Sequence, residues 1–555
     1  MNKKVCSFPI LFALLALVIG TCAVVFPASA QAAPTSTGSI TVSGTVASSY
    51  DAYQIFDANV IDDDNDAKIA TDLAWASDAV RDAALPVLHS AGMSKSQTTA
   101  QEAAEWLNAD SHLTSALSAQ LARSLQSSGA VSVALNAGAA AKLPCGYWLI
   151  VADDDAIAQN EAGTAPIMAL VGGSAVTVKP KAATPKVSKH VLEDSTAAWQ
   201  KAADATVADD LYWRLSATVP AGLTAYDAYA VQFVDTMSSG LNLSKVAASV
   251  RVYVAAGADG GFDAVSADKD GRVGTEPAKG WTDITAQCAT KVAADGTFTV
   301  RTGDLIAALG GADAFAAGAR VVAVYNAPLN SACSHGIAKG NPNEVYLRYP
   351  RSPFADQSSD AGFTHTPSDD ACAYTWDLAL TKRGSDGDKP LAGAVLSITD
   401  DRGRTLAADG TWDAEGKATV TTGEDGRVTV SGVDSGKLEV RELKAPKGYT
   451  AFEGTRSVTV KAEGLDVDQV AAAKPKLTIT AESPLRADSA DGSTGSLEAS
   501  LINTPTGTPP SITTGGFMPS TGDMAMYAAA AAAVAGAALI VVALLVKRGG
   551  GSHKE

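Results

Sequence analysis

Short segments in which apolar and polar residues alternate run through most of the chain, from about residue 38 to residue 503. This two-residue periodicity predicts β-strands that bury one face. Between residues 38 and 178 the predicted strands include SITVSGTV, AYQIF, YWLIVAD, APIMALV and SAVTV. In residues 96–125, apolar residues instead recur every three or four positions, which predicts helix. We therefore expect a β-rich or α+β first domain that carries a helical insertion.

The rest of the pattern predicts two more β-rich domains. The middle region contains LYWRLSATV, AVQFVDTM, RVYVAAG, RVVAVYNA and EVYLRY, joined by turns rich in Gly and Asp. Eight further segments, from TWDLALTK to SLEASLIN, follow at the short spacing that is typical of a β-sandwich. The polar stretches VKPKAATPKVSKHV and SPFADQSSDAGFTHTPSDD predict linkers, and TPTGTPPSITTGG predicts an extended spacer.

Both ends of the chain carry targeting patterns. Two lysines, an apolar run and Ala28-Ser29-Ala30 predict a signal peptide over residues 1–30. Residues 524–546 are uninterrupted apolar sequence, long enough as a helix to cross a hydrocarbon layer of ~30 Å. Lys547 and Arg548 follow, so the tail, residues 547–555, is expected to stay cytoplasmic. The body between these segments is therefore expected outside the cell.

Charge and cysteine content narrow the class of protein. The chain has 60 acidic against 43 basic residues, a net charge of -17, which argues against binding to nucleic acid. Two of the six cysteines lie in the predicted signal peptide, and the other four permit three disulfide pairings in an oxidising compartment. We predict a Cys288–Cys333 disulfide because both cysteines lie in the middle region.

Common catalytic and cofactor motifs are absent from the sequence. It contains no P-loop, no G-x-G-x-x-G, no H-E-x-x-H and no nucleophile elbow. The acidic run at residues 62–66 lacks the Gly and Glu of a calcium-binding EF-hand loop, because Ala67 and Leu73 stand at those positions. We expect no cofactor, no metal site and no turnover enzyme. A secreted enzyme with an unrecognised site in the first domain stays the alternative.

The C-terminal region contains a pentapeptide directly before the apolar span, Met518-Pro519-Ser520-Thr521-Gly522. Pentapeptide, apolar span and basic tail together resemble the LPxTG cell-wall sorting signal of Gram-positive surface proteins, with Met518 in place of the usual Leu. The resemblance implies that a sortase cleaves between Thr521 and Gly522 through a thioester intermediate. The sortase would then transfer Thr521 to an amine, either of another protein subunit or of peptidoglycan.

A lysine that would accept Thr521 lies in the first linker. The segment from Val176 to Lys181 reads VTVKPK, which resembles the pilin motif of sortase-assembled pili, Val-x-Val-Tyr-Pro-Lys. Lys181 occupies the position of the polymerising lysine, and Lys179 stands in place of Tyr and is the fallback nucleophile. A lysine in an exposed linker is flexible and accessible to a large enzyme. Joining Thr521 to Lys181 of another copy would give an open head-to-tail fibre.

The last domain contains a second family motif. GKLEVRELKAPKGYT resembles the E-box of Cna B-type domains, with Glu442 at the acid position. The opening strand places Lys382, and the closing strand places Asn503, where that family has the partners of an isopeptide bond. The resemblance implies that the amine of Lys382 attacks the side-chain amide of Asn503 while Glu442 assists the proton transfers.

The middle domain resembles such domains less completely. Lys189 takes the first-strand position, and FVDTMSSGL makes Asp235 the candidate acid. The closing segment expected to contain an asparagine reads YPRSP at residues 349–353, so the sequence favours the absence of a bond here. The alternative is that Asn341 or Asn343 replaces the missing residue from a shifted position.

These features predict a mainly β protein, with tandem Ig-like or Cna B-type sandwiches, that serves as the shaft subunit of a sortase-assembled pilus. A wall-anchored adhesin and a minor pilin are the alternatives. Its expected partners are sortase, further copies of itself, peptidoglycan and a host or surface ligand. The predicted divisions are signal peptide 1–30, first domain 31–178, middle domain 179–353, last domain 354–505, spacer 506–517, sorting motif 518–522, transmembrane helix 524–546 and tail 547–555.

Overall fold

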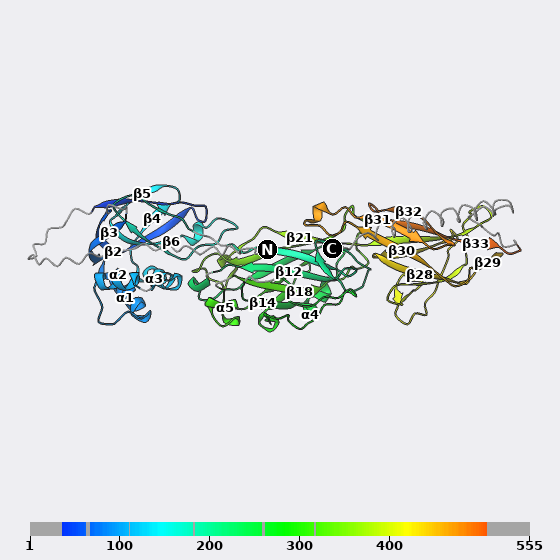
Figure 1. Ribbon diagram of the computed structural model, residues 1–555, viewed down its shortest axis with the longest axis horizontal. Coiled ribbons are helices and arrows are strands. Elements are labelled where there is room, and N and C mark those ends of the chain that lie inside the picture. Colours follow the sequence, from blue (N-terminus) through cyan, green and yellow to red (C-terminus); the bar gives the residue numbers. More distant parts are fainter. Residues whose placement is uncertain are drawn as a thin grey trace, which may run out of the picture.

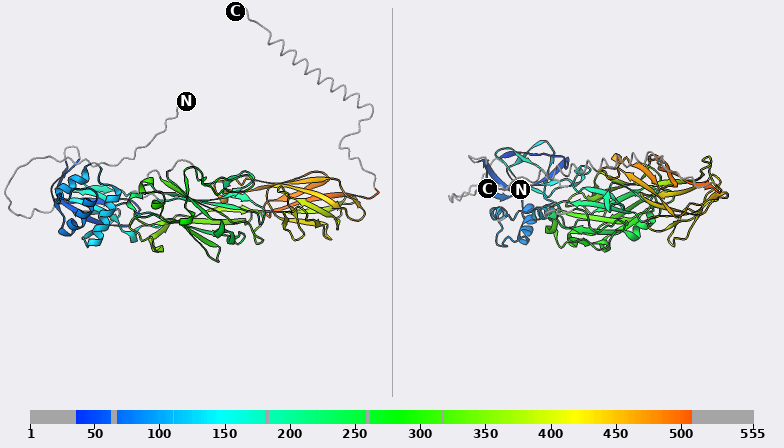
Figure 2. Two further views of the ribbon diagram at one scale, coloured as in Figure 1. Left: turned by 90° about the horizontal axis from the view of Figure 1, so that it is seen from below. Right: turned by 45° about the vertical axis from the view of Figure 1, so that its right-hand side comes forward.

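The computed structural model describes residues 36–62, 67–109, 111–180, 184–221, 223–257, 261–315 and 318–507. These residues form three domains that lie end to end in an elongated rod (Figure 1). The first domain lies at one end, the middle domain follows, and the last domain forms the other end; a second orientation shows the same linear order (Figure 2). The prediction of a mainly β protein with tandem sheets is confirmed.

The first domain has two sheets and three helices. The larger sheet has the order β3-β2-β6-β7, with β4 also paired to β2, and the smaller sheet has the order β5-β1-β8. The strands are β1 (Thr37–Val42), β2 (Ser49–Asp62), β3 (Lys68–Trp75), β4 (Ser132–Asn136), β5 (Ala140–Pro144), β6 (Gly146–Ala152), β7 (Ile167–Val171) and β8 (Val176–Val178). The helices are α1 (Asp78–Ser90), α2 (Ala100–Asn108) and α3 (Ser115–Ser128).

Side chains on opposite faces of β2 pack into two different hydrophobic cores, which explains the layered arrangement of this domain. Tyr50 and Ala52 face a core shared with the smaller sheet, whereas Tyr53 and Ile55 face the core beneath the helices. The predicted helical stretch contains two helices, α2 and α3, of which α2 begins with a capping box between Thr99 and Glu102. Helix α1 was not predicted from the sequence.

The middle domain is a sandwich of two sheets around one large core. Their orders are β10-β9-β12-β18-β14-β15 and β11-β21-β19-β13-β17-β16, with β20 paired to β19. The strands are β9 (Val187–Glu193), β10 (Ala198–Gln200), β11 (Ala202–Asp204), β12 (Tyr212–Val219), β13 (Gln232–Met237), β14 (Arg251–Ala255), β15 (Trp281–Asp283), β16 (Ala289–Val292), β17 (Thr297–Arg301), β18 (Ala319–Asn326), β19 (Asn341–Pro350), β20 (Phe363–His365) and β21 (Asp369–Tyr374). Two short helices, α4 (Val246–Ser249) and α5 (Leu305–Ala308), lie in its connections.

The last domain is a second two-sheet sandwich. One sheet has the order β27-β22-β33-β29 with β32 beside β33, and the other has the order β25-β24-β23-β28-β30-β31 with β26 beside β23. The strands are β22 (Trp376–Gly384), β23 (Val395–Thr399), β24 (Thr405–Leu406), β25 (Trp412–Asp413), β26 (Val420–Thr421), β27 (Arg427–Val433), β28 (Gly436–Lys444), β29 (Tyr449–Thr450), β30 (Thr455–Glu463), β31 (Lys476–Ala481), β32 (Leu485–Asp491) and β33 (Ser496–Pro505). The first and last strands, β22 and β33, are parallel neighbours.

The boundary between the middle and last domains differs from the predicted one after residue 353. Strand β21 pairs with β19 and with β11, and β20 pairs with β19, so both strands belong to the middle sandwich. The middle domain therefore extends to Tyr374 and the last domain begins at Trp376. The polar composition of residues 352–370 was typical of a linker, and it concealed the short strands that complete the sheet.

Polar contacts hold the middle and last domains together. A carboxylate oxygen of Asp204 accepts hydrogen bonds from Trp376 Nε1 and from the backbone and side chain of Ser435, each at 2.7 Å. Arg402 and Arg404 of the last domain both form ion pairs with Asp209 of the middle domain. Asp204 is buried and Asp209 is largely buried, whereas Arg402 lies at the exposed edge of the contact. Charge-assisted hydrogen bonds to these two carboxylates favour a stiff joint between the two domains.

Candidate functional site

Three buried polar side chains meet inside the last domain. Lys382 on β22, Glu442 on β28 and Asn503 on β33 are all buried, with the lysine wholly inaccessible to solvent. One oxygen of Glu442, Oε1, lies 3.3 Å from the Lys382 amine and accepts a hydrogen bond of 2.8 Å from Asn503 Nδ2. The carboxyl group therefore contacts both the amine and the amide.

Strand order explains why these residues meet. In the parallel pair β22–β33, Lys382 lies opposite Leu501 and Gly384 lies opposite Asn503. Asn503 is therefore two residues beyond the position opposite Lys382, and the two side chains point to the same face of the sheet. The amine of Lys382 also lies 3.4 Å from the Leu501 carbonyl oxygen. The backbone N–H of Phe452 donates to the second Glu442 oxygen at 3.1 Å and fixes the carboxyl group.

The environment of this cluster favours an uncharged, nucleophilic amine. Burial lowers the pKa of Lys382 to about 8, although the neighbouring Glu442 opposes the shift. The side-chain carbonyl oxygen of Asn503 is buried and has no hydrogen-bond partner in the described structure. A buried carbonyl without a donor is unfavourable unless chemistry or protonation supplies a partner.

A second buried cluster of a lysine, an acid and an asparagine lies in the core of the middle domain. Lys189 on β9, Asp235 on β13 and Asn343 on β19 each have no solvent-exposed surface. The Lys189 amine contacts Asp235 Oδ2 directly. The hydroxyl of Tyr325 on β18 lies 3.0 Å from that amine, donates to the Asp235 carboxylate at 3.0 Å and accepts from Asn343 Nδ2 at 2.8 Å.

Burial shifts the protonation of both titratable members of this cluster toward their neutral forms. Desolvation lowers the pKa of Lys189 to about 8 and raises the pKa of Asp235, while the attraction between the two groups acts in the opposite direction. Asn343 Oδ1 and Asp235 Oδ1 are buried without partners in the described structure. The cluster thus has the same unpaired amide oxygen as the last domain.

The structure distinguishes the two asparagines that the sequence left open. Asn341 is fully paired, because its Nδ2 donates to the carbonyls of Ser334 and Ala373 and its Oδ1 accepts from the Ser334 backbone. Asn343 instead joins the lysine and aspartate cluster. The sequence favoured the absence of a cross-link in this domain. The structure nevertheless brings together an amine, a carboxyl group and an amide, which are the groups that such a cross-link requires. Tyr325 was not predicted, because a tyrosine in a buried strand carries no distinguishing sequence signal.

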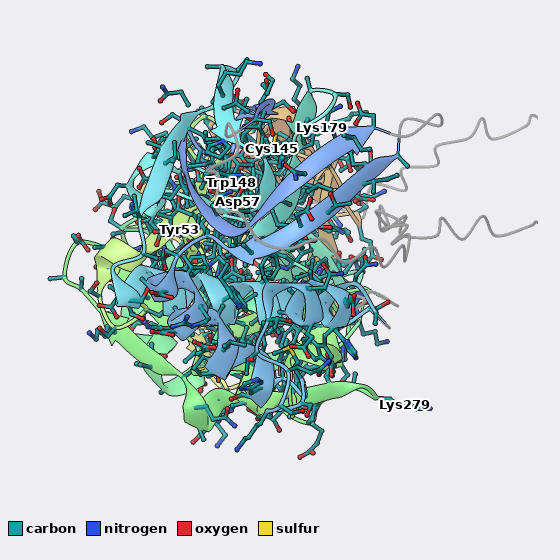
Figure 3. All side chains as sticks on the ribbon, turned by 90° about the vertical axis from the view of Figure 1, so that its left-hand side faces the viewer. Tyr53, Asp57, Cys145, Trp148, Lys179 and Lys279 are labelled. Carbon is teal, nitrogen blue, oxygen red and sulfur yellow. The ribbon has the colours of Figure 1, made fainter. Side chains whose placement is uncertain are left out.

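The predicted polymerisation residues lie at or beyond the edge of the described structure. Lys179 follows β8 and is exposed at the end of the first domain (Figure 3). Lys181, the sorting motif at 518–522, the signal peptide and the transmembrane segment at 524–546 lie outside the described residues. Among the residues that the structure does describe, no helix is long and apolar enough to cross a membrane.

The predicted Cys288–Cys333 disulfide is wrong in this structure. All four cysteines in the described body, Cys145, Cys288, Cys333 and Cys372, are free. The Cys288 thiol donates to the Ile284 carbonyl at 3.3 Å, and the Cys333 sulfur lies 3.6 Å from His335 Nε2. The prediction was based on the fact that both cysteines lie in the middle region. Lying in the same region does not bring the two sulfurs together.

Comparison with known protein families identifies part of the last domain. Residues 377–474 match the SpaA prealbumin-like fold domain. The match includes Lys382 and Glu442, and Asn503 lies beyond it.

One curated relative is the trypsin-resistant surface T6 protein of Streptococcus pyogenes serotype M6. It is 30% identical over 143 residues, an aligned region that covers 24% of this chain and 24% of that protein. The chain therefore matches about a quarter of this relative's length.

Solved structures with an overall similarity include two pilins. The T6 backbone pilin of serotype M6 Streptococcus pyogenes is 17% identical, with a TM-score of 0.45, over 86% of this chain and 100% of that one. The major pilin SpaD of Corynebacterium diphtheriae is 14% identical, with a TM-score of 0.40, over 85% of this chain and 98% of that one.

Proposed function

We propose that this chain is a structural subunit of a covalently polymerised pilus on the cell surface. The observation that carries the proposal is the buried lysine, acid and asparagine cluster, present in both the middle and the last domain. The elongated three-domain rod, the match to a prealbumin-like SpaA domain and the similarity to a streptococcal surface protein support it. The chain acts as a building unit and not as a turnover enzyme.

In the last domain we propose a single self-catalysed condensation. The neutral amine of Lys382 attacks the side-chain carbonyl carbon of Asn503, which forms a new amide bond. Glu442, in contact with both groups, reacts in its protonated form: it gives its proton to the carbonyl oxygen, takes a proton from the attacking amine and passes it to the amide nitrogen of Asn503. The bond between the side-chain carbon and that nitrogen then breaks, ammonia leaves, and the oxygen returns its proton to Glu442. Packing supplies the high effective concentration, so the reaction needs no separate enzyme.

In the middle domain the same reaction joins Lys189 to Asn343. Asp235 takes the role of the proton carrier, and Tyr325 relays protons because its hydroxyl contacts the amine, the carboxyl group and the amide nitrogen. The bond connects β9, the first strand of the domain, to β19 in the opposite sheet. A pulling force along the rod would then act on covalent bonds and not on sheet hydrogen bonds alone.

Assembly follows from the sorting motif and the linker lysine, which lie outside the described residues. A sortase cleaves after Thr521 and transfers that residue to Lys181 of another copy, and the last copy is joined to peptidoglycan. Such a shaft presents the subunits to a host or surface ligand and supports adhesion. The product is a fibre that stays attached to the cell wall.

The test is the size distribution of the protein on cells of its own bacterium. A pilus subunit gives a ladder of high-mass species that resists boiling in SDS, and Lys181→Ala removes the ladder. Lys179→Ala is the matched control, because Lys179 lies two residues away in the same linker, and it should leave the ladder intact. A single monomer band in the unaltered strain would instead support a wall-anchored adhesin.

A further inference from the structure

A thiol, an imidazole and a carboxylate lie in a row where the middle and last domains meet. Cys333 Sγ lies 3.6 Å from His335 Nε2, and His335 Nδ1 lies 2.8 Å from Asp377 Oδ2. Cys333 and His335 lie in the connection between β18 and β19, whereas Asp377 lies on β22 of the last domain. None of the three belongs to the cross-link clusters described above.

The row depends on the docking of one domain against the other. The backbone N–H of Gly336 donates to the Thr375 carbonyl, and that of Ile337 donates to the Gly492 carbonyl, both at 3.1 Å. Gly336 has φ +74°, and a Cβ there would lie 2.5 Å from the Gly495 nitrogen, so only glycine permits this approach. The connection between β18 and β19 is thereby held against the last domain.

Asp377 is itself held in place. Its Oδ1 accepts from the Ser431 hydroxyl at 2.6 Å and from the Gly432 backbone at 3.1 Å, which leaves Oδ2 facing His335. The Nδ1 atom and Oδ2 are close without the alignment of a hydrogen bond, so the carboxylate acts on the ring mainly through its charge.

The arrangement suits a thiol nucleophile, Cys333, that needs a neighbouring base, His335, to remove its proton. Burial and the charge of Asp377 raise the pKa of the Cys333 thiol, so the thiol is protonated at neutral pH and reacts slowly without help. The imidazole of His335 supplies that help, because its Nε2 lies within reach of the sulfur and can accept the thiol proton. Cys333 and His335 are both partly exposed, so a small molecule can reach them.

We propose that Cys333 is a base-assisted thiol that exchanges with small-molecule disulfides, which makes it a covalent modification site. The Cys333 thiol gives its proton to His335, and its sulfur attacks one sulfur of the disulfide. A new S–S bond forms between Cys333 and that half, and the original S–S bond breaks. The other half leaves as a thiolate and takes the proton back from His335. Cys333 is oxidised and the incoming disulfide is reduced, so no other reagent is required.

Cys288 offers an internal control. It is also partly buried and also has a raised thiol pKa, about 11, caused mainly by burial. The hydrogen-bond partner of its sulfur is the Ile284 carbonyl, which cannot accept a proton from the thiol as a base does. Comparison within one molecule therefore isolates the effect of the imidazole.

The experiment treats the folded chain with dipyridyl disulfide at pH 7 and follows each cysteine by peptide mass mapping. Cys333 should be modified about tenfold faster than Cys288, and His335→Gln should slow Cys333 by about tenfold while the rate at Cys288 stays unchanged.

The direction in which the Cys333 rate changes in His335→Gln distinguishes a base role of His335 from a purely structural role. If His335 only held the domain joint together, His335→Gln would expose the thiol and Cys333 would react faster. An equal rate at the two cysteines, or a rate at Cys333 that is unchanged or higher in His335→Gln, would overturn the proposal.

Discussion

The cross-link of the last domain gives the most quantitative prediction. Glu442→Gln removes the carboxyl group that contacts both the Lys382 amine and the Asn503 amide, so the condensation should stop. A bond between positions 382 and 503 would close a loop of about 120 residues. In the chain-entropy relation for cross-links, a loop of this length stabilises the folded state by about 5 kcal/mol. The melting temperature of the last domain should therefore fall by roughly 10–20 °C.

Two measurements on the purified chain check this. Intact mass spectrometry should show that the variant has lost one molecule of ammonia fewer than the unaltered chain. Calorimetry should show a lower melting temperature for the last domain. Glu439→Gln is the matched control, because Glu439 is an exposed carboxylate on the same strand. A Glu442→Gln variant with the ammonia still lost and the transition unmoved would refute the proposed role of the acid.

Three further outcomes follow from the buried groups. In Asn503→Ala, Lys382 stays unlinked, with a pKa of about 8 in the folded chain against about 10.4 in the unfolded chain. Between these two pH values the unfolded state binds more protons, so the melting temperature should rise with pH across that window. A double variant that also carries Lys382→Met should lack this rise, and parallel pH curves for the two variants would contradict the reasoning. Intact mass should show the loss of one ammonia fewer in Asn343→Ala and no such change in Asn341→Ala; the reverse result would move the middle cross-link to Asn341. Asp204→Ala removes the acceptor of three hydrogen bonds across the domain joint and should lower the free energy of unfolding by about 1–3 kcal/mol in denaturant titration, and an unchanged midpoint would show that the joint does not depend on them.

Much of the fold could be predicted because strands that bury one face alternate in sequence. The same alternation separates the two cores on either side of β2. Helix α1 was missed since its sequence, DAVRDAALPVLHS, contains Pro86, which normally interrupts a helix. The boundary near residue 353 was misplaced because two short strands lie within a polar, linker-like composition.

The candidate site in the last domain could be predicted because its lysine, acid and asparagine each lie in a recognisable motif. The middle cluster could only be assembled in part. Lys189 and Asp235 lie in strand contexts that resemble the family, but Asn343 precedes the expected closing position by several residues. Its pairing with the Tyr325 hydroxyl depends on the order of strands across two sheets, which no local pattern contains. The row of Cys333, His335 and Asp377 depends likewise on the docking of two domains.

The most direct test of the central proposal is the chemistry of the junction between subunits. Surface material from the bacterium is digested with a protease, and branched peptides are sequenced by tandem mass spectrometry. A polymerised pilus subunit predicts a branched peptide in which the carboxyl group of Thr521 forms an amide with the side-chain amine of Lys181. Thr521 joined only to peptidoglycan, with Lys181 recovered unmodified, would contradict the pilus and leave a wall-anchored monomer.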